Sequence, residues 1–545
     1  MASTDGAPTG PPRPPTDRPG PPTDRPRSGL AGRIEPVRAG LIGLLAAGVS
    51  LGVGQLVAAA FRPVAAPVIA VGNRFIVLTP EPVKRWAIDR FGTGDKSALL
   101  TGIYLVLALA AVLVGLAAAR RLRYGLAGVA LLGVLGGYCA LTAPAHRAGD
   151  AVPSVLGALA GLGCLAALHR AAERDAIAGP ARRQPDGQLV TGRRRFLSAG
   201  LTAAGVALVG GLGGRLAQFS RFDANAARAR ITLPPPAEPA PVPAGFDLGK
   251  GAVPFQTPNN RFYRIDTALS VPQLDPGSWR LRIHGNVRRE LQLSYADLLA
   301  RPLVERWITL TCVSNEVGGD LISTALFRGV RLADLLREAG VAADADQLVA
   351  TSSDGMTIGT PTATVLDGRD ALLAVGMNGQ PLPVEHGFPV RMVVPGLYGY
   401  VSACKWIVDL EATTFAAYQA YWVRGGWAPR GPVRLASRID RPSGSQAVRV
   451  GTEIPVAGVA WHQHTGISRV EVQVDDEAWQ PAVLARVPSA DTWRQWVWLW
   501  TPRTPGRHRL RVRAYDAGGT AQDATPADPF PAGATGLHTI AVTAR

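Results

Sequence analysis

The sequence predicts a multi-domain protein with an N-terminal α-helical membrane domain of five helices, an α+β domain and a C-terminal β-sandwich. Three features of the sequence predict this order. Long uncharged runs fill the first 215 residues, a proline-rich stretch follows, and short strands recur evenly towards the C-terminus. Charged residues are only 18% and hydrophobic residues 47% of the 545 residues. Because soluble domains carry about 25% charged residues, part of this chain is expected to lie in a membrane.

The charge and the cysteine content exclude several classes of protein. The net charge is +16 and the mean hydropathy is +0.12. Basic residues placed between apolar runs are typical of membrane helices with basic flanks. No long Lys/Arg run lies beside an aromatic platform, so we expect no nucleic-acid partner. Four cysteines in 545 residues are too few for a disulfide scaffold, and the lack of any CxxC pair excludes a thiolate zinc finger.

Residues 1–38 are predicted to form a disordered, proline-rich tail in the cytoplasm. The first 26 residues hold nine prolines, and PPTDRP occurs at 14–19 and again at 21–26. Such a segment has too little apolar surface to bury for a stable fold. A ligand for proline-binding domains of the SH3 type is the alternative interpretation.

The next part of the chain, residues 39–215, is predicted to be a transmembrane domain of five helices. A helix needs about 20 apolar residues to cross the hydrocarbon core of a bilayer. Buried helices of soluble proteins are rarely apolar on every face over such a length. Five runs without charged residues or histidine meet the requirement: 39–61, 97–119, 124–145, 151–168 and 196–214.

The distribution of basic residues gives the expected orientation in the membrane. With the N-terminus in the cytoplasm, the inner segments 1–38, 120–123 and 169–195 carry 16 Lys and Arg residues. The outer loops 62–96 and 146–150 then carry seven. Five crossings from this start place everything after residue 215 outside the cytoplasm.

The start of the fifth run gives a second indication of export. It reads GRRRFL from Gly192 to Leu197, directly before small apolar residues. This pattern resembles the twin-arginine signal of bacteria, which exports folded proteins. No Ala-x-Ala cleavage site is obvious at the end of this run, so we expect the segment to remain as an anchor. Simple basic flanking of a membrane helix is the alternative interpretation.

Three further parts are predicted beyond the membrane domain. Residues 216–245 are expected to be a proline-rich linker, because 233–243 reads LPPPAEPAPVP. Residues 246–432 mix strand and helix signals, as in the alternating run Trp279–Gly285 and the capped short helix Ser294–Leu299. Residues 433–545 carry a strand about every ten residues, which is typical of a β-sandwich. The expected strands are Val456–Ala460, Val470–Val474, Trp496–Trp500, Leu510–Tyr515 and Thr539–Val542.

A candidate reactive group in this second half is Cys312. The half contains no GxSxG elbow, no HExxH helix and no Walker loop. Polar residues gather instead in the segment TLTCVSNEVGG, residues 309–319. A strand that ends in a polar turn presents a thiol at the rim of a pocket, and a thiolate is a soft ligand for a polarisable metal. An inert buried cysteine is the alternative interpretation.

Two further segments resemble a known family. Residues 377–391 read MNGQPLPVEHGFPVR, followed by VVPGLYG at 393–399 and by Lys405-Trp406. This arrangement resembles the molybdopterin domain of the sulfite-oxidase family. The segment NNRFYR, residues 259–264, is similar to a cofactor-binding segment of bacterial members of that family. The resemblance covers about residues 246–545, since the family's C-terminal dimerisation domain, an immunoglobulin-like β-sandwich, fits residues 433–545.

The resemblance implies a molybdenum-molybdopterin cofactor and a set of residues around it. Cys312 stands where the family's metal-binding thiolate does, with further sulfur ligands from the pterin dithiolene. An arginine and a lysine suit a buried phosphate, because one offers paired donors and the other a point charge. The implied cofactor-binding residues are Asn260, Tyr263, Arg264, Cys312, His386, Arg391, Cys404 and Lys405. The candidate residues on the substrate side, beside Cys312, are Asn315, Glu316, Tyr398 and Tyr400.

One departure from the family affects the expected substrate. Sulfite oxidases usually carry an arginine soon after the metal-binding cysteine, in a CxGNRR-like turn. Here the turn carries Glu316, whose carboxylate would repel sulfite. We therefore expect two-electron oxo transfer outside the cytoplasm, either reduction of an S- or N-oxide or oxidation of a reduced sulfur compound.

The family resemblance also bears on the expected redox partner, and one alternative function remains. The exported half has no haem module, so the redox partner is expected to be a quinone or a separate haem or cytochrome subunit. The resemblance also implies a homodimer through the C-terminal domain. The alternative is a cofactor-free, membrane-anchored scaffold that binds a partner. A scaffold has no reason to bring Cys312, Arg391 and Lys405 into one pocket.

Overall fold

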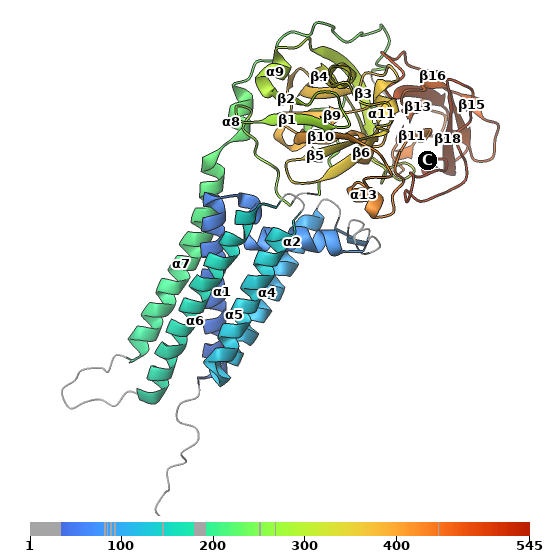
Figure 1. The fold of residues 1–545 in the computed structure, drawn as a ribbon. Coiled ribbons are helices and arrows are strands. Elements are labelled where there is room, and N and C mark those ends of the chain that lie inside the picture. The colour runs from blue at the N-terminus through green and yellow to red at the C-terminus, as the bar shows by residue number, and fades with distance from the viewer. Residues whose placement is uncertain are drawn as a thin grey trace, which may run out of the picture.

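The protein consists of a helical rod and a larger globular half in the computed structural model (Figure 1). The structure describes residues 34–80, 94–143, 146–178, 192–249, 252–267, 269–444 and 446–545, and the isolated positions 83, 86, 87, 90 and 91. Residues 1–33 of the predicted tail lie outside the described residues. So do the side chains of Arg193, Arg194 and Arg195 in the predicted export signal.

Among the residues that the structure describes, five helices of the rod are long and apolar enough to cross a membrane, as the sequence predicts. Each follows one of the uncharged runs, and α1 begins with a proline at a position where no backbone N–H is needed. A sixth apolar helix is shorter and lies at the end of the rod that faces the globular half (Figure 1). The long helices are α1 (Pro36–Ala60), α4 (Asp95–Arg120), α5 (Leu122–Leu141), α6 (Val152–Ala178) and α7 (Gly192–Arg221), and the short one is α2 (Pro67–Leu78).

Glycines let the backbones of the membrane helices approach closely. Helix α1 packs against α4, α6 and α7. A Cβ atom added at Gly43 of α1 would fall onto the carbonyl oxygen of Ala111 in α4, and one at Gly115 would fall onto that of Ala39. Small residues at helix contacts are the usual means of association where lipid removes the hydrophobic driving force. The glycine content of these runs therefore reflects packing.

The globular half begins with an α+β domain built on two five-stranded sheets. In the first sheet the order is β2-β1-β10-β5-β6, with β1 parallel to β10 and the other pairs antiparallel. Its strands are β1 (Arg280–Gly285), β2 (Leu291–Ser294), β5 (Gln347–Ser352), β6 (Thr357–Pro361) and β10 (Ile407–Thr413). The second sheet runs β3-β4-β7-β8 with β9 added to β7, from β3 (Val304–Thr311), β4 (Ile322–Arg331), β7 (Leu372–Met377), β8 (Gln380–Pro381) and β9 (Arg391–Val393).

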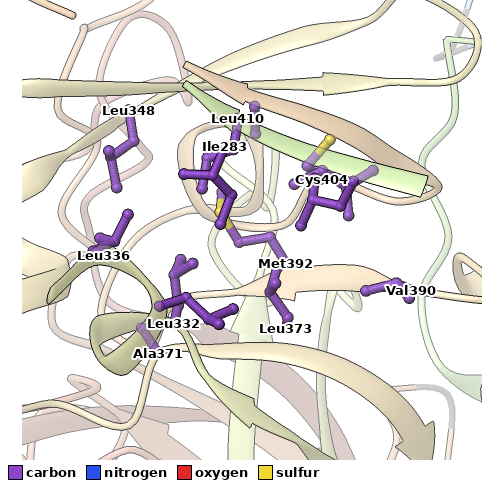
Figure 2. Close-up of a cluster of buried hydrophobic side chains, with 14 of the residues drawn as sticks. Ile283, Leu332, Leu336, Leu348, Ala371, Leu373, Val390, Met392, Cys404 and Leu410 are labelled. Carbon is purple, nitrogen blue, oxygen red and sulfur yellow. The ribbon is translucent and has the colours of Figure 1, made fainter. Parts of the chain in front are cut away.

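Short helices connect these strands and close one continuous core. Leucines of α10 contact the inner faces of both sheets, and Cys404 packs at the edge of this cluster (Figure 2). Ser294 caps α9 with the reciprocal hydrogen bonds of a capping box, as predicted. The helices are η4 (Asn259–Arg261), α9 (Tyr295–Leu299), α10 (Leu332–Ala339), α11 (Thr362–Leu366), η5 (Val384–His386), α12 (Gly399–Ser402) and α13 (Tyr421–Arg424).

The C-terminal region is β-rich, and its two sheets share one buried core. One sheet has the order β11-β13-β17-β16 and the other β12-β19-β18-β14-β15. The first contains β11 (Ala436–Arg441), β13 (Ile454–Trp461), β16 (Val483–Leu484) and β17 (Arg494–Trp500). The second contains β12 (Ala447–Val448), β14 (Ile467–Val474), β15 (Gln480–Pro481), β18 (Gly506–Asp516) and β19 (Thr539–Ala544). Each predicted strand lies within one of these, while the immunoglobulin-like assignment stays a prediction.

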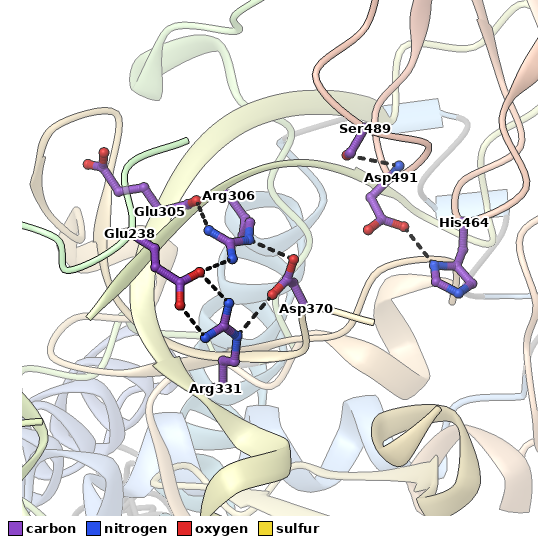
Figure 3. A network of polar contacts seen from close by, with 8 residues as sticks. All are labelled: Glu238, Glu305, Arg306, Arg331, Asp370, His464, Ser489 and Asp491. Atoms are coloured by element: carbon purple, nitrogen blue, oxygen red, sulfur yellow. Dashed lines mark hydrogen bonds and ion pairs between the residues drawn. The ribbon is translucent and has the colours of Figure 1, made fainter. Parts of the chain in front are cut away.

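The expected linker is not a free spacer. Residues 224–238, which we call the docked segment, lie along the α+β domain. Ala224 opens α8 (Ala224–Ala229) and is fully buried against that domain, and Leu233 packs on its core. Glu238 then forms ion pairs with Arg306 and Arg331, which Asp370 bridges on the other side (Figure 3). Proline composition predicted the extended backbone but gave no sign of these long-range partners.

An aromatic interface joins the C-terminal region to β3. Trp493 donates from its indole nitrogen to the Phe255 carbonyl over 3.0 Å, and from its backbone to the Thr309 hydroxyl over 2.7 Å. Gln463 donates to the Thr311 hydroxyl over 2.7 Å. Phe255 also meets Trp307 edge to face, with ring centroids 5.4 Å apart. The C-terminal region therefore fixes the position of β3 up to its last residue.

The close contact of α1 with α4 predicts that Gly43→Ala destabilises the membrane domain. Its new methyl group meets backbone, which cannot move aside, so we expect a loss of about 1–3 kcal/mol. Thermal unfolding of the detergent-purified protein measures this. Gly163→Ala is the matched control, because nothing lies within 4 Å of a Cβ at that position of α6. Equal unfolding temperatures for the two variants would contradict the close packing of α1 against α4.

The ion pairs of Glu238 predict a pH-dependent contribution to stability. Hydrogen bonds from Arg331 and Arg306 lower the pKa of Glu238 to about 2. A carboxyl whose pKa falls on folding stabilises above its unfolded pKa of about 4.3, and the gain disappears as the pH falls towards 2. Glu238→Gln should lower the unfolding temperature by a constant few degrees from pH 5 to 8, and by less below pH 4. Glu290→Gln, at the exposed pair with Arg282, is the control with little effect. A difference in unfolding temperature between Glu238→Gln and the wild type that does not change with pH would argue against a role for the Glu238 charge.

Candidate active site

The turn after β3 presents Cys312 to the interior. The Cys312 backbone N–H donates to the Leu321 carbonyl over 2.9 Å, and its carbonyl accepts from Asn315 over 3.1 Å. The Asn315 side chain accepts from the Leu321 N–H over 2.8 Å and so closes the turn. Burial raises the pKa of the Cys312 thiol, and hydrogen bonds from Ser314 oppose that rise. The strand and turn predicted around this cysteine are therefore present, with Asn315 as a residue that positions it.

A cavity of about 620 Å³ lies in front of this cysteine. Residues from the η4 segment, the Cys312 turn, η5, β9 and α12 meet there, although they are far apart in the sequence. The cavity brings together most of the predicted site residues: Tyr263, Cys312, Asn315, Glu316, His386, Arg391, Tyr400, Cys404 and Lys405.

Arg391 lies at the base of the cavity with part of its hydrogen-bonding capacity unused. Its side chain is 5% exposed, and its Nη1 donates to the His386 carbonyl over 3.2 Å. Its Nε is buried and has no partner among the described residues. Burial lowers the pKa of Arg391 to about 10, yet the group still carries its charge at neutral pH. An unpaired buried guanidinium is costly, so this one is expected to meet an anion.

His386 and Lys405 complete the polar base. The His386 Nε2 lies 2.9 Å from the Asn259 carbonyl, and burial lowers the pKa of this histidine to about 4. It is therefore neutral at pH 7. Lys405 donates to the Ile265 carbonyl over 3.0 Å and pairs with Asp266. Burial lowers the pKa of Lys405 to about 8 against the opposing effect of Asp266.

Tyr263 connects the thiol side of the cavity to the guanidinium side. It stacks on Phe262, with ring centroids 5.5 Å apart, and Phe262 meets His386 edge to face. Burial raises the pKa of Tyr263; nearby Cys312 adds to the rise and Arg391 opposes it. The tyrosine hydroxyl is thus a neutral donor between the two groups.

Three predicted site residues do not line the cavity. Asn260 is exposed, and its neighbour Asn259 makes the contacts instead, accepting from the Asn378 amide over 2.7 Å. Arg264 is 45% exposed and pairs with Asp266, so it supports the wall from behind. Tyr398 is buried, and its hydroxyl accepts from the Arg434 backbone over 3.3 Å. A short sequence motif does not show which side chain of a turn faces inward, so the sequence alone did not distinguish Asn259 from Asn260.

Several lining residues escaped the sequence analysis. Asp266 lies two residues after the predicted motif and is nearly fully buried, so its closeness to the motif was the one available signal. Trp422 and Trp427 follow the last strand of the α+β domain. Asp528 and Phe530 come from the C-terminal region, more than 200 positions beyond Cys312. Their place in the cavity depends on how two domains dock.

The donor set fits a molybdenum-pterin cofactor and not a metal held by protein alone. The described residues contain no cluster of three or more His, Cys, Asp or Glu side chains that could hold a metal ion. A single thiolate at Cys312 must therefore share its metal with ligands from a cofactor. The orphaned Nε of Arg391 and the ammonium of Lys405 match a buried anionic group such as a phosphate. The residues present thus fit the group that the family resemblance implies.

Comparison with known proteins gives the same result. Residues 268–422 match the family described as "Oxidoreductase molybdopterin binding domain". Human mitochondrial sulfite oxidase is 33% identical over 327 residues, which are 50% of this chain and 58% of that protein. The uncharacterized oxidoreductase YuiH of Bacillus subtilis is 34% identical over 157 residues, which are 29% of this chain and 76% of YuiH. The chain belongs to the sulfite-oxidase family of molybdopterin-dependent oxidoreductases.

Membership of the family carries the enzyme class and the cofactor. The protein is a molybdenum-dependent oxidoreductase with a molybdenum-molybdopterin cofactor. The chain spans 58% of the length of human sulfite oxidase, so the substrate and partners of that enzyme cannot be assigned to this chain. The solved structure of the sulfane dehydrogenase SoxCD from Paracoccus pantotrophus is 25% identical with a TM-score of 0.44, covering 50% of this chain and 75% of that chain.

Because Arg391 is buried without a full set of partners among the described residues, replacing it should lower the cofactor content without lowering the stability of the cofactor-free protein. Arg391→Met removes an unpaired charge, so the cofactor-free protein should unfold at the same temperature as the wild type or higher. Molybdenum and pterin content should fall at least about tenfold. Arg328→Met is the control, because its ion pair with Glu305 is structural: stability falls and cofactor content does not. Full cofactor content in Arg391→Met would refute this role.

Proposed function

We propose that this protein is a membrane-anchored molybdopterin oxidoreductase that works outside the cytoplasm. Its reaction is two-electron oxo transfer on a small molecule, reducing an S- or N-oxide or oxidising a reduced sulfur compound. The observation that carries the proposal is the meeting of Cys312, Arg391 and Lys405 in one cavity. A cofactor-free scaffold would have no use for a thiol beside an unpaired buried guanidinium.

The proposed cofactor-binding groups divide between two ends of the cavity. Cys312 would bind the metal, and Arg391 with Lys405 would hold the anionic end of the pterin. His386, neutral and fixed by the Asn259 carbonyl, would contact the ring system. Molybdenum bound to the pterin supplies the two-electron oxygen-atom chemistry.

The chain's own groups would bind the substrate and move protons. When an S-oxide is reduced, one sulfoxide takes up two protons and two electrons and gives one sulfide and one water, with the electrons from a redox partner. Glu316 is exposed at the cavity rim, where it can exchange protons with solvent. Tyr263 is half-buried and its raised hydroxyl pKa keeps it protonated, so its role is to donate a hydrogen bond. Tyr400 is held by the Ala428 carbonyl and would form part of the substrate wall.

The proposed side of the membrane and the proposed redox partner are inferred from the membrane helices and from the position of the cavity. The Lys/Arg count supports a cytoplasmic N-terminus and a globular half on the other side. Gly72 of α2 lies against Leu269, three positions beyond the cavity residue Asp266, and α13 is on the face of the globular half towards the rod (Figure 1). This closeness favours a redox partner at the membrane surface.

A membrane quinone suits that place better than a haem within the rod. The first 222 residues contain two histidines, His146 and His169. His169 lies 17 positions into α6 and its Nε2 contacts Glu173 at 3.1 Å, while His146 precedes the start of that helix. At about 1.5 Å per residue the two are separated by most of a membrane thickness, too far for one iron. A separate haem subunit is the other partner to test, and a homodimer through the C-terminal region stays part of the proposal.

Elemental analysis tests the proposed function. The wild-type protein, produced with full cofactor supply, should contain near-stoichiometric molybdenum and a pterin detected by fluorescence after oxidation. Cys312→Ser should keep the pterin and lose turnover of S-oxides with an artificial electron donor. Cys164→Ser is the matched control, because this thiol lies in the apolar helix α6 and is not among the described residues that line the cavity, so turnover should survive. Wild-type protein without molybdenum and pterin would overturn the proposal.

A further inference from the structure

The substrate side of the cavity is acidic. The basic side chains among its described lining residues are Arg391, which is buried, and Lys405, which is largely buried and already paired with Asp266. Four more carboxylates line the same cavity, and the described residues include no ion pair to any of them: Glu316, Asp320, Asp354 and Asp528. Once a phosphate occupies Arg391, the potential left for a substrate is negative.

Aromatic rings form the wall beside these carboxylates. Trp427 lies at the centre, edge to face with Trp422 at 6.4 Å and with Phe530 at 5.3 Å between centroids. Tyr400 is tilted against it at 6.0 Å. All four rings line the cavity, and the buried indole N–H of Trp427 has no partner among the described residues. That donor is available to an acceptor atom of a ligand.

The C-terminal region holds its part of this wall rigidly. Asp528 and Phe530 lie in a loop that is bonded to the α+β domain by the Ala428 N–H, which donates to the Pro531 carbonyl over 3.0 Å. Within the C-terminal region, the Arg434 side chain donates to the Ala532 carbonyl over 2.9 Å. The same loop is closed by a bond from the Gly533 N–H to the Pro529 carbonyl over 2.7 Å. A wall fixed before binding costs little entropy when a ligand arrives.

We propose that this cavity selects a substrate with a positively charged organic group, such as a quaternary ammonium or a protonated amine, beside its S- or N-oxide. Aromatic faces next to carboxylates attract organic cations, which lose little hydration on binding, while the same carboxylates repel sulfite and nitrate. Asp528 and Phe530 are the residues from the C-terminal region that set this preference. The inference rests on the proposed oxo-transfer function and names its substrate class.

A binding measurement on the oxidised, cofactor-loaded protein tests the preference without turnover. The probes are two methyl phenyl sulfoxides that differ in the para substituent, one trimethylammonium and one sulfonate. Isothermal titration at low ionic strength should give a Kd for the cation at least about tenfold below that for the anion, a ratio that shrinks at high salt. Equal or reversed affinities would overturn the inference and leave the proposed function standing.

Variants assign the preference to the wall. Asp528→Asn and Phe530→Leu should each lower the ratio of the affinity for the cationic sulfoxide to that for the anionic sulfoxide at least about threefold. The molybdenum and pterin content of both variants should stay unchanged. Asp476→Asn, at an 89% exposed site in the same region, is the matched control and should bind like the wild type. A ratio unchanged in both wall variants would refute their role. If the molybdenum-loaded protein binds the cationic sulfoxide selectively but turns over neither probe, the proposed sulfoxide reduction is wrong and the inferred charge preference stands.

Discussion

The site depends on the docking of the C-terminal region onto β3. Strand β3 ends one residue before Cys312, and the hydroxyls of Thr309 and Thr311 are held from the other domain by Trp493 and Gln463. The same docking brings Asp528 and Phe530 into the lining of the cavity. One interface therefore fixes both the thiol and the surface that faces the substrate, and a change in domain packing would alter both together. This explains why so many tryptophans gather where the two domains meet.

Electrostatics divides the cavity into two halves with different tasks. At the base, Lys405 is paired with Asp266, and Arg391 keeps its positive charge under burial. The Arg391 Nε has no partner in the described part of the chain, and a bound anion would supply one. At the rim, carboxylates and aromatic rings give a negative and polarisable surface. The enzyme class follows from the base, which matches the family. The substrate class that we propose rests on the rim, where Glu316 stands in place of the arginine that the family resemblance leads one to expect.

Local pattern predicted much of the fold, and the long-range contacts were beyond it. The alternation of 279–285 and the cap at Ser294 predicted β1 and α9, and regular spacing predicted the C-terminal strands. The HGFP block led to His386 and Arg391 because those residues are close in sequence. Glu238 was missed as an anchor, since its partners Arg306 and Arg331 come from β3 and the end of β4. Trp427 and Phe530 were missed for the same reason.

The most direct test is a structure of the cofactor-loaded protein with anomalous scattering at the molybdenum edge. The account predicts an anomalous peak at bonding distance from the Cys312 Sγ, and a phosphate that accepts a hydrogen bond from the Arg391 Nε. It also predicts that Trp427 and Phe530 border the open side of the metal. A metal bound elsewhere in the chain, or a cofactor phosphate that does not contact Arg391, would contradict the account.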